Sequence, residues 1–378
     1  TSLPASCLFG ATAVVASVVN SSSAFCISPA NSQGAAAVSL EMTLNGERES
    51  RCRTVSSAGF AFYDAAAVTI ASVSPLGGTT RGNTRVVVRG SGYVDRGGVF
   101  CRFGAGASAV VAATLRSSSE LECVSPALAT QGQALMALTL NGDLEAFTET
   151  NESFTYYVES LEGTSLAVSA VVPVAGPSAG GSLLNVSGTG FTSLGGVYCR
   201  FGAGAERIVA GTIVSAERME CRSPPISGPL QLAFGNPLGV PAGGQREHVQ
   251  VSLNGQDYTR EGPWFLAFDQ RLVHVSRVVP RGGPLAGGTR VVVLGSGFAD
   301  HNVHCRFGDG GVGTATLRAT LLNASALACE TVAHAAEEDV AFGVTLNGDV
   351  SAHTMTSDEV VFSFYNSSAV TIASVSPL

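Results

Sequence analysis

The chain has 378 residues, of which 45 are Gly, 7% are aromatic and only 13% are charged. Its net charge is −8, every one of its 21 positive charges is an Arg, and no basic run occurs, which argues against binding to nucleic acid or to an anionic membrane. With 45% hydrophobic residues it is too apolar for a disordered chain, yet no apolar run approaches the ~18 residues of a membrane-spanning helix.

Four segments of the chain share one pattern of short β-branched runs separated by Gly- and Pro-rich turns. Each segment has "C-[LR]-F-G", a second Cys about twenty residues later, then "LNG" and an aromatic run. No helical periodicity is sustained, so the pattern predicts an all-β protein with internal repeats. The motif positions are Cys7, Cys26 and Asn45; Cys101, Cys123 and Asn141; Cys199, Cys221 and Asn254; and Cys305, Cys329 and Asn347.

A front half precedes the first Cys in three of these segments. Its copies begin "VSPLGG", "VVPVAG" and "VVPRGG", and each predicts a short strand, a turn, a β-branched strand and then "G-[ST]-G-[YF]". Together with "CRFG", "C-x-S-P" and "LNG", this pattern resembles the IPT/TIG family of immunoglobulin-like domains, found in plexins, fibrocystin-like surface proteins and Rel-type transcription factors. The resemblance implies an elongated array of tandem β-sandwiches with about seven strands each.

The borders of the repeats predict the domain organisation. A partial IPT/TIG domain, its C-terminal part, occupies residues 1–64, and full domains occupy 65–158, 159–268 and 269–366. Residues 367–378 correspond to the first strand of a further domain. Linkers are nearly absent, which favours a stiff rod over domains on flexible linkers.

The decapeptide "AVTIASVSPL" occurs at residues 67–76 and again, 302 positions later, at residues 369–378. Both ends of the chain therefore fall within a predicted sandwich. One interpretation is that these residues are a window on a longer tandem array. The other is that the C-terminal strand of one chain completes the open half-sandwich of the next by strand addition. The second is harder, because the stub lacks an equivalent of residues 84–93.

The domain at 159–268 carries an insertion near 226–248. Its second Cys and the Asn of "LNG" are 33 positions apart, compared with 18 or 19 in the other segments. The apolar, Gly- and Pro-rich insertion is either a contact loop or a tolerated surface insertion. The candidate contact residues are Leu230, Leu232, Phe234, Leu238 and Val240.

Nine Cys form four pairs within segments and leave Cys52 outside them. The IPT/TIG resemblance supports disulfides that link neighbouring strands, and buried thiols are the alternative. Disulfides imply an oxidising, extracellular compartment. Cys52 is interpreted as an inter-chain cross-link, a partner for a Cys elsewhere or a buried thiol. The expected pairs are Cys7–Cys26, Cys101–Cys123, Cys199–Cys221 and Cys305–Cys329.

Five N-x-[ST] sequons support a secreted glycoprotein with covalent glycans. Period-2 alternation places Leu184 and Val186 inward and Asn185 outward. High Ala, Gly and Arg without Lys is typical of GC-rich coding, as in some green algae. The sequons are at Asn20, Asn151, Asn185, Asn323 and Asn366.

No motif predicts catalysis, a cofactor or a metal site. "HNVHC" at His301, His304 and Cys305 resembles a metal cluster, but a strand would direct the two imidazoles to opposite faces. "LNGD" lacks the spacing of a calcium loop and is interpreted as a type I′ hairpin turn. No Ser-His-Asp order, nucleophile elbow or P-loop is present.

These features predict a non-catalytic structural or adhesive extracellular glycoprotein, secreted or at the cell surface. A sharper form is a protomer of a fibril or cell-surface filament, which associates with itself or with surface proteins and glycans. The alternative is the ectodomain of a plexin- or fibrocystin-like receptor. A nuclear DNA-binding module is disfavoured by the paired Cys, the sequons and the missing basic patches, and an enzyme would carry its catalytic domain outside these residues.

Overall fold

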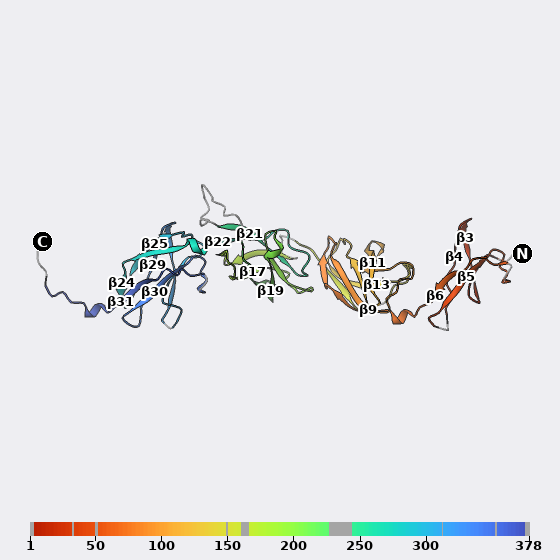
Figure 1. The fold of residues 1–378 in the computed structure, drawn as a ribbon, viewed down its shortest axis with the longest axis horizontal. Coiled ribbons are helices and arrows are strands. Elements are labelled where there is room, and N and C mark those ends of the chain that lie inside the picture. The colour runs from red at the N-terminus through yellow and green to blue at the C-terminus, as the bar shows by residue number, and fades with distance from the viewer. Residues whose placement is uncertain are drawn as a thin grey trace. The chain divides into compact units, whose positions relative to one another are not determined.

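The computed structural model describes residues 4–31, 34–49, 52–148, 150–159, 166–226, 244–311, 313–351 and 354–374. The regular elements there are β-strands and one-turn 3₁₀ helices, which confirms the all-β prediction (Figure 1). None of the helices among these residues is long and apolar enough to cross a membrane. The chain divides into two compact units: unit 1 contains Thr1–Ser74, Arg85–Pro126 and Gln133–Phe154, and unit 2 contains Pro75–Thr84, Ala127–Gly132 and Thr155–Leu378.

Unit 1 begins with the partial repeat of residues 1–64, which forms a four-stranded antiparallel sheet and a separate hairpin. Phe9 packs edge-to-face on Phe60 with ring centroids 4.9 Å apart, and Phe62 completes this small core. In sheet order the strands are β2 (Thr12–Val15), β1 (Ser6–Phe9), β5 (Ala37–Thr43) and β6 (Ala58–Ala61), and the hairpin is β3 (Ser17–Asn20) with β4 (Ser23–Phe25).

Most strands of the first repeat, residues 65–158, also lie in unit 1. Alternation of β-branched and charged residues places Val86 and Val88 in the core, each 0% exposed, while Arg85 and Arg89 lie on the surface. The strands in sheet order are β7 (Thr69–Ser74), β9 (Arg85–Ser91), β12 (Glu120–Val124), β11 (Val110–Ser117), β10 (Phe100–Phe103) and β13 (Gly132–Thr139).

Unit 2 contains the second repeat, residues 159–268, as a complete set of eight strands (Figure 1). A short strand from the front half pairs in parallel with the closing aromatic strand, as β8 (Gly77–Thr79) also does with β14 (Ser153–Tyr157). In sheet order these are β15 (Ala167–Val172), β17 (Leu183–Thr189), β20 (Arg218–Arg222), β19 (Ile208–Ser215), β18 (Tyr198–Phe201), β21 (Gln245–Ser252), β22 (Trp264–Phe268) and β16 (Ala175–Pro177).

The third repeat, residues 269–366, forms two separate sheets in unit 2 that enclose an aromatic core of Phe307, Phe342, Phe362 and Phe364. One sheet contains β23 (His274–Val279), β25 (Arg290–Ser296), β29 (Ala326–Glu330) and β28 (Thr320–Asn323). The other contains β24 (Gly282–Pro284), β31 (Val360–Tyr365), β30 (Glu338–Thr345), β26 (His304–Phe307) and β27 (Ala315–Arg318).

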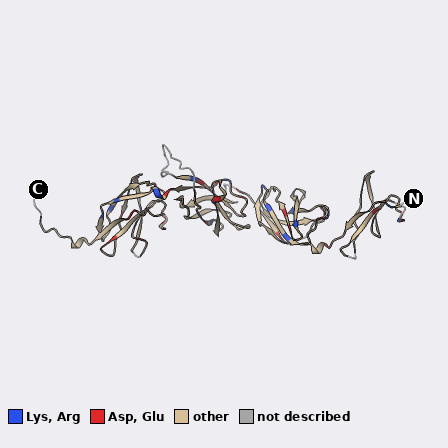
Figure 2. Ribbon diagram, viewed as in Figure 1, with Lys and Arg blue, Asp and Glu red and all other residues tan. Residues whose placement is uncertain are grey.

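One-turn 3₁₀ helices occur at chain connections and in loops. An Asx side chain caps those that follow the closing strands: Asp64, Asp269 and Asn366 each accept a hydrogen bond from the backbone N–H two residues later. The helices are η2 (Ala65–Ala67), η3 (Ala107–Ala109), η4 (Ala205–Arg207), η5 (Gln270–Leu272) and η6 (Ser367–Ala369). Charged residues are sparse on the strands of each repeat (Figure 2).

The prediction that the disulfides join neighbouring strands is wrong: in the first and second repeats they join strands that flank a third. In the second repeat, Cys199 on β18 and Cys221 on β20 lie on either side of β19, with Cα atoms 6.4 Å apart. In the third repeat, Cys305 and Cys329 belong to different sheets. The bond therefore ties one sheet to the other across the core, because the intervening chain passes from one sheet to the other.

The "LNG" turns are also not type I′ hairpins, which was the prediction. That turn needs positive φ at both central residues, but only the Gly has it, for example Gly142 at 73°. Instead, the Asn141 side-chain oxygen accepts hydrogen bonds from the Thr139 hydroxyl and the Asp143 N–H. The Asn is therefore a polar anchor at the end of a strand, and the next strand begins only at Ser153.

Removal of the disulfide of the second repeat, in Cys199→Ala/Cys221→Ala, is expected to lower the free energy of unfolding of that repeat by about 2–5 kcal/mol. Both Cys are buried, so part of the decrease in the free energy of unfolding comes from lost packing of the two sulfur atoms in the core. Urea unfolding is followed by the fluorescence of Trp264, the one Trp of the chain, which lies in this repeat. The Cys52→Ala variant is the control, expected to change this transition by under about 0.5 kcal/mol. Equal midpoints for the double variant and the control would contradict the stabilising role.

Candidate functional site at the junctions between repeats

Within unit 2, the contacts between segments of successive repeats involve two elements that occupy equivalent places in each repeat. One is the short front-half strand, represented by Gly77 in β8 and by Ala175 in β16. The other is the "LNG" turn, represented by Asn254 and by Asn347. Each short strand contacts the "LNG" turn of the repeat that follows it, so the same surfaces meet at both junctions.

At the first junction, the Asn254 side-chain amide donates a hydrogen bond to the Gly77 carbonyl oxygen, at 2.9 Å. The same amide nitrogen donates to the Asp257 carboxylate at 2.7 Å, and the Asn254 side-chain oxygen accepts from the Gln256 and Asp257 N–H groups. Asn254 is only 5% exposed. One buried amide thus organises its own turn and satisfies a carbonyl of the preceding repeat.

At the second junction, the Asn347 side-chain amide donates to the Ala175 carbonyl oxygen, also at 2.9 Å. Its side-chain oxygen accepts from the Thr345 hydroxyl and the Asp349 N–H, so the local turn is the same. Asn347 is 2% exposed, whereas Asn45 and Asn141 of the partial and first repeats are exposed. Burial of the Asn therefore comes from the junction and not from the turn.

Charged and hydroxyl groups supplement the amide at the first junction. The Arg81 guanidinium donates two hydrogen bonds of 2.9 Å to the Glu159 carboxylate, and the Glu159 side chain is only 7% exposed. The Thr84 hydroxyl donates to Asp257 at 2.7 Å. Together with the amide contact, these bonds attach the segment Pro75–Thr84 to the second repeat at several points within unit 2.

Apolar packing completes both junctions. Tyr157, the last residue of β14, belongs to the core cluster of the second repeat, and Phe268, the equivalent residue of β22, belongs to that of the third. They are 9% and 0% exposed, whereas the equivalent Tyr365 is 45% exposed. Burial raises the pKa of the Tyr157 hydroxyl far above its ordinary value, and the Asp257 and Glu159 carboxylates raise it further, so this group stays neutral.

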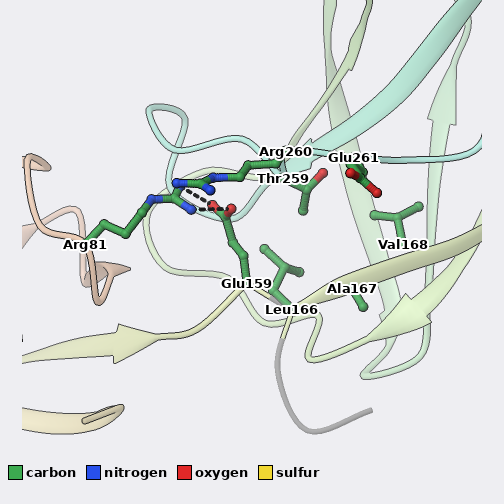
Figure 3. A pocket seen from close by; sticks show the side chains of 8 residues that line it. All are labelled: Arg81, Glu159, Leu166, Ala167, Val168, Thr259, Arg260 and Glu261. Carbon is green, nitrogen blue, oxygen red and sulfur yellow. Dashed lines mark hydrogen bonds and ion pairs between the residues drawn. The ribbon is translucent and has the colours of Figure 1, made fainter. Parts of the chain in front are cut away.

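A small pocket of about 170 Å³ adjoins the Arg81–Glu159 ion pair (Figure 3). One side of the pocket is apolar and is lined by Leu166, Ala167 and Val168. The lining also contains one further positive and one further negative side chain, Arg260 and Glu261. The one hydroxyl of its lining, Thr259, accepts a hydrogen bond from the Val251 N–H. The lining contains no imidazole or thiol, and its charged groups are two guanidinium groups and two carboxylates.

The structure places all eight predicted disulfide Cys in the four expected pairs. Cys52 is half-buried, and its thiol donates a hydrogen bond to the Glu47 carboxylate at 3.0 Å. The predicted contact residues of the insertion, Leu230, Leu232, Phe234, Leu238 and Val240, lie outside the described residues.

Four sequon side chains are exposed: Asn20, Asn151, Asn323 and Asn366. Asn185 in β17 is half-buried, while its neighbours Leu184 and Val186 are 0% exposed, as the period-2 alternation predicted. The outward position of Asn185 on the sheet is therefore consistent with the strand pattern.

No group of three or more His, Cys, Asp or Glu side chains is placed to hold a metal ion in the part of the chain that the structure describes. In "HNVHC", His304 is the first residue of β26 and its ring nitrogen contacts the Asn302 carbonyl at 2.7 Å, while Cys305 is in a disulfide. The sequence motif therefore forms a strand entrance with no metal-ligand geometry.

The "LNG" motif predicted only a turn at Asn254 and Asn347 and did not indicate their role at the junctions. The sequence shows that "LNG" and the "P-x-[GA]-G" of the front half both recur in each full repeat. Nothing in either motif shows that the two meet, because the partners are separated by 177 positions at the first junction and 172 at the second.

The fold defines a class: tandem immunoglobulin-like β-sandwiches joined by short, ordered junctions. A family profile described as "IPT/TIG domain" matches residues 68–156, 166–259 and 274–364. The chain therefore belongs to the IPT/TIG family, as the motifs indicated.

Searches of curated proteins found no significant sequence match. Among solved structures, the chain is similar to the full extracellular region of plexin A4, with 15% identity, 97% coverage of this chain and a TM-score of 0.43. The chain spans 35% of that plexin structure. It is also similar to the Escherichia coli adhesin FdeC, with 13% identity, 80% and 98% coverage of the two chains and a TM-score of 0.24.

Replacement of Asn254 by Ala is expected to destabilise the second repeat by about 1–3 kcal/mol more than Asn141→Ala destabilises the first, because it also leaves the Gly77 carbonyl unsatisfied. Both variants remove the bonds that the Asn side-chain oxygen accepts from the hydroxyl two residues earlier and the N–H two residues later. Only Asn254→Ala also removes the amide bonds to the Gly77 carbonyl and the Asp257 carboxylate, so the difference between the variants measures these amide bonds. Hydrogen exchange read by mass spectrometry resolves each repeat. Equal losses in the two variants would show that the inter-repeat bond contributes nothing.

Proposed function

We propose that this protein is a structural or adhesive extracellular glycoprotein whose IPT/TIG repeats act as load-bearing spacers and have no catalytic activity. The observation that carries the proposal is the recurrence of one buried amide-to-carbonyl bond, at 2.9 Å, at both junctions of unit 2. Repeats that only needed to be tethered would not need buried polar contacts between them, since such groups are costly unless they are paired.

The repeat is the functional unit in this proposal, with domains at 65–158, 159–268 and 269–366 and partial domains at 1–64 and 367–378. Each junction combines an aromatic side chain buried in the next core with hydrogen bonds to the next "LNG" turn. A hinge between the repeats of unit 2 would have to expose Phe268 or Tyr157 and break a buried hydrogen bond. Stiffness between these repeats follows from that cost.

Secretion or display at the cell surface is supported by the chemistry of the chain. Each repeat has one disulfide across its core, and such bonds persist in oxidising compartments. Four of the sequon Asn side chains are exposed, as attachment of a glycan requires. Covalent glycans are therefore part of the proposal, and no cofactor is.

Self-association into a fibril is the sharper form of the proposal. Sparse charge on the strands lowers the electrostatic cost of bringing stiff repeats side by side (Figure 2). The apolar insertion near 226–248 is the proposed contact.

Sedimentation velocity over a wide concentration range tests the fibril, with cryo-electron microscopy of the native material as the direct view. The expected result is concentration-dependent assembly, weakened about a hundredfold in Phe234→Ser/Leu238→Ser, because loss of about 1.4 kcal/mol at each of the two contacts adds to about 2.8 kcal/mol. Leu322→Ser is the matched control, because Leu322 is an exposed Leu of the third repeat. A monomer at all concentrations would refute the fibril and leave the repeat architecture untouched.

Glycosylation is tested by enzymatic release of N-glycans from the native protein, followed by peptide mass spectrometry. Release converts an occupied Asn to Asp, so the exposed Asn20, Asn151, Asn323 and Asn366 are expected to carry the label. Asn185, which is half-buried, is expected to be occupied to a lesser degree. Unmodified peptides at all five positions would refute the glycoprotein part of the proposal.

A further inference from the structure

We propose that the outer face of the second repeat binds an acidic glycan, with Trp264 as the stacking platform and Arg246 as the partner of its carboxylate or sulfate. This inference deepens the adhesive part of the proposed function and rests on it. The site is an open groove of about 520 Å³ on β18, β21 and β22, within unit 2. Its lining residues are Arg200, Gly202, Ala203, Arg246, Glu247, His248, Gln250 and Trp264.

The strand register brings these side chains to one face. Gln250 is opposite Arg200 across β18 and β21, and His248 is opposite Trp264 across β21 and β22. Arg246, His248 and Gln250 alternate with the buried Val249 and therefore point away from the core. The groove is thus built on paired strands and not on a loop. Paired strands hold the side chains of a binding site more precisely than a loop does.

Trp264 is the distinctive group of this groove. It is 52% exposed although it is the first residue of β22, whose other four residues are buried. One side is supported by the His248 ring, with centroids 3.6 Å apart and planes 32° apart. His248 is in turn held by the Gly262 carbonyl, 2.7 Å from its Nδ1. A fixed indole with a solvent-exposed side is an apolar, flat surface of the kind on which the C–H face of a pyranose ring packs.

The charges of the groove favour an anion. Arg200 is held in place by two hydrogen bonds to Gln250, at 2.8 and 3.0 Å, and by stacking on Tyr258 at 4.2 Å. The Glu247 carboxylate does not neutralise the positive charge of Arg200, because Glu247 forms an ion pair with Arg207. Arg246 is exposed and has no ion-pair partner among the described residues. A planar carboxylate or a sulfate is the group that a guanidinium binds most specifically.

The equivalent faces of the other repeats lack this set. In the third repeat the register places Ala341 where His248 stands and Val361 where Trp264 stands. In the first repeat Leu135 takes the place of His248. The second repeat therefore has both a stacking residue, Trp264, and a cation without an ion-pair partner among the described residues, Arg246. The first and third repeats have only the Arg that corresponds to Arg200. A packing role common to all repeats does not account for this difference.

The experiment titrates the 378-residue chain with oligogalacturonate, and separately with a sulfated and a neutral oligosaccharide of equal length. Tryptophan fluorescence reports binding at this groove directly, because Trp264 is the one Trp in the sequence. The expected result is a saturable change in its fluorescence with the acidic sugars and at least about tenfold weaker binding of the neutral one, since hydrogen bonds to charged groups contribute about 1.5–3 kcal/mol. Preference for the carboxylated or the sulfated probe distinguishes the two sources of the anion.

Variants are compared by calorimetry, which needs no Trp. Arg246→Ala and Trp264→Ala are each expected to weaken binding about tenfold or more, whereas Trp264→Phe retains most of the affinity. Val361→Ala, on the same face of the third repeat, is the matched control and is expected to bind as the parent chain does. Circular dichroism checks that each variant is folded.

Three outcomes would overturn the inference: no saturable binding of either acidic probe, equal affinity for the neutral one, or unchanged binding by folded Trp264→Ala. Failure of the proposed function is scored separately, by sedimentation and glycan mapping, which do not involve this groove.

Discussion

The side-chain amide of the "LNG" Asn is the group on which the order between repeats depends. Its oxygen closes the turn that ends a strand, and its nitrogen reaches a carbonyl of the preceding repeat, at 2.9 Å in both junctions. Because the amide is buried, each of these bonds must be made, or the folded state loses about 1–3 kcal/mol. One residue therefore contributes both to its local turn and to the contact with the preceding repeat.

The rest of each junction follows from that alignment. Once the amide meets the short parallel strand, the last aromatic residue of the closing strand enters the core of the following repeat, as Tyr157 and Phe268 do. The disulfide holds the core beneath it by linking one sheet to the other. These contacts use the ends of the sandwich, so the broad outer faces remain available. In the second repeat that face presents Trp264 and Arg246. The proposed glycan site and the contacts between repeats therefore use different surfaces of the same sandwich.

Much of the fold could be predicted from the sequence because it depends on local periodicity. Alternation along "SLLNVSG" predicted that Leu184 and Val186 point into the core, and both are 0% exposed. The same alternation in "RVVVRGS" buries Val86 and Val88. The recurring motifs were sufficient to indicate the IPT/TIG family. The IPT/TIG resemblance indicated the disulfide partners but not the strands between them, since an interval of about twenty residues does not show where the chain crosses to the other sheet.

The sequence by itself determined the strand pattern, the repeat and the paired Cys, because each of these arises from residues that are close in the chain. Only the tertiary structure decided that the Asn of "LNG" is a junction residue, since its partner carbonyl is more than 170 positions away. The same holds for the groove of the second repeat, where Arg200, His248 and Trp264 meet through strand pairing. Local preference sets the strands, whereas register and burial decide which side chains meet.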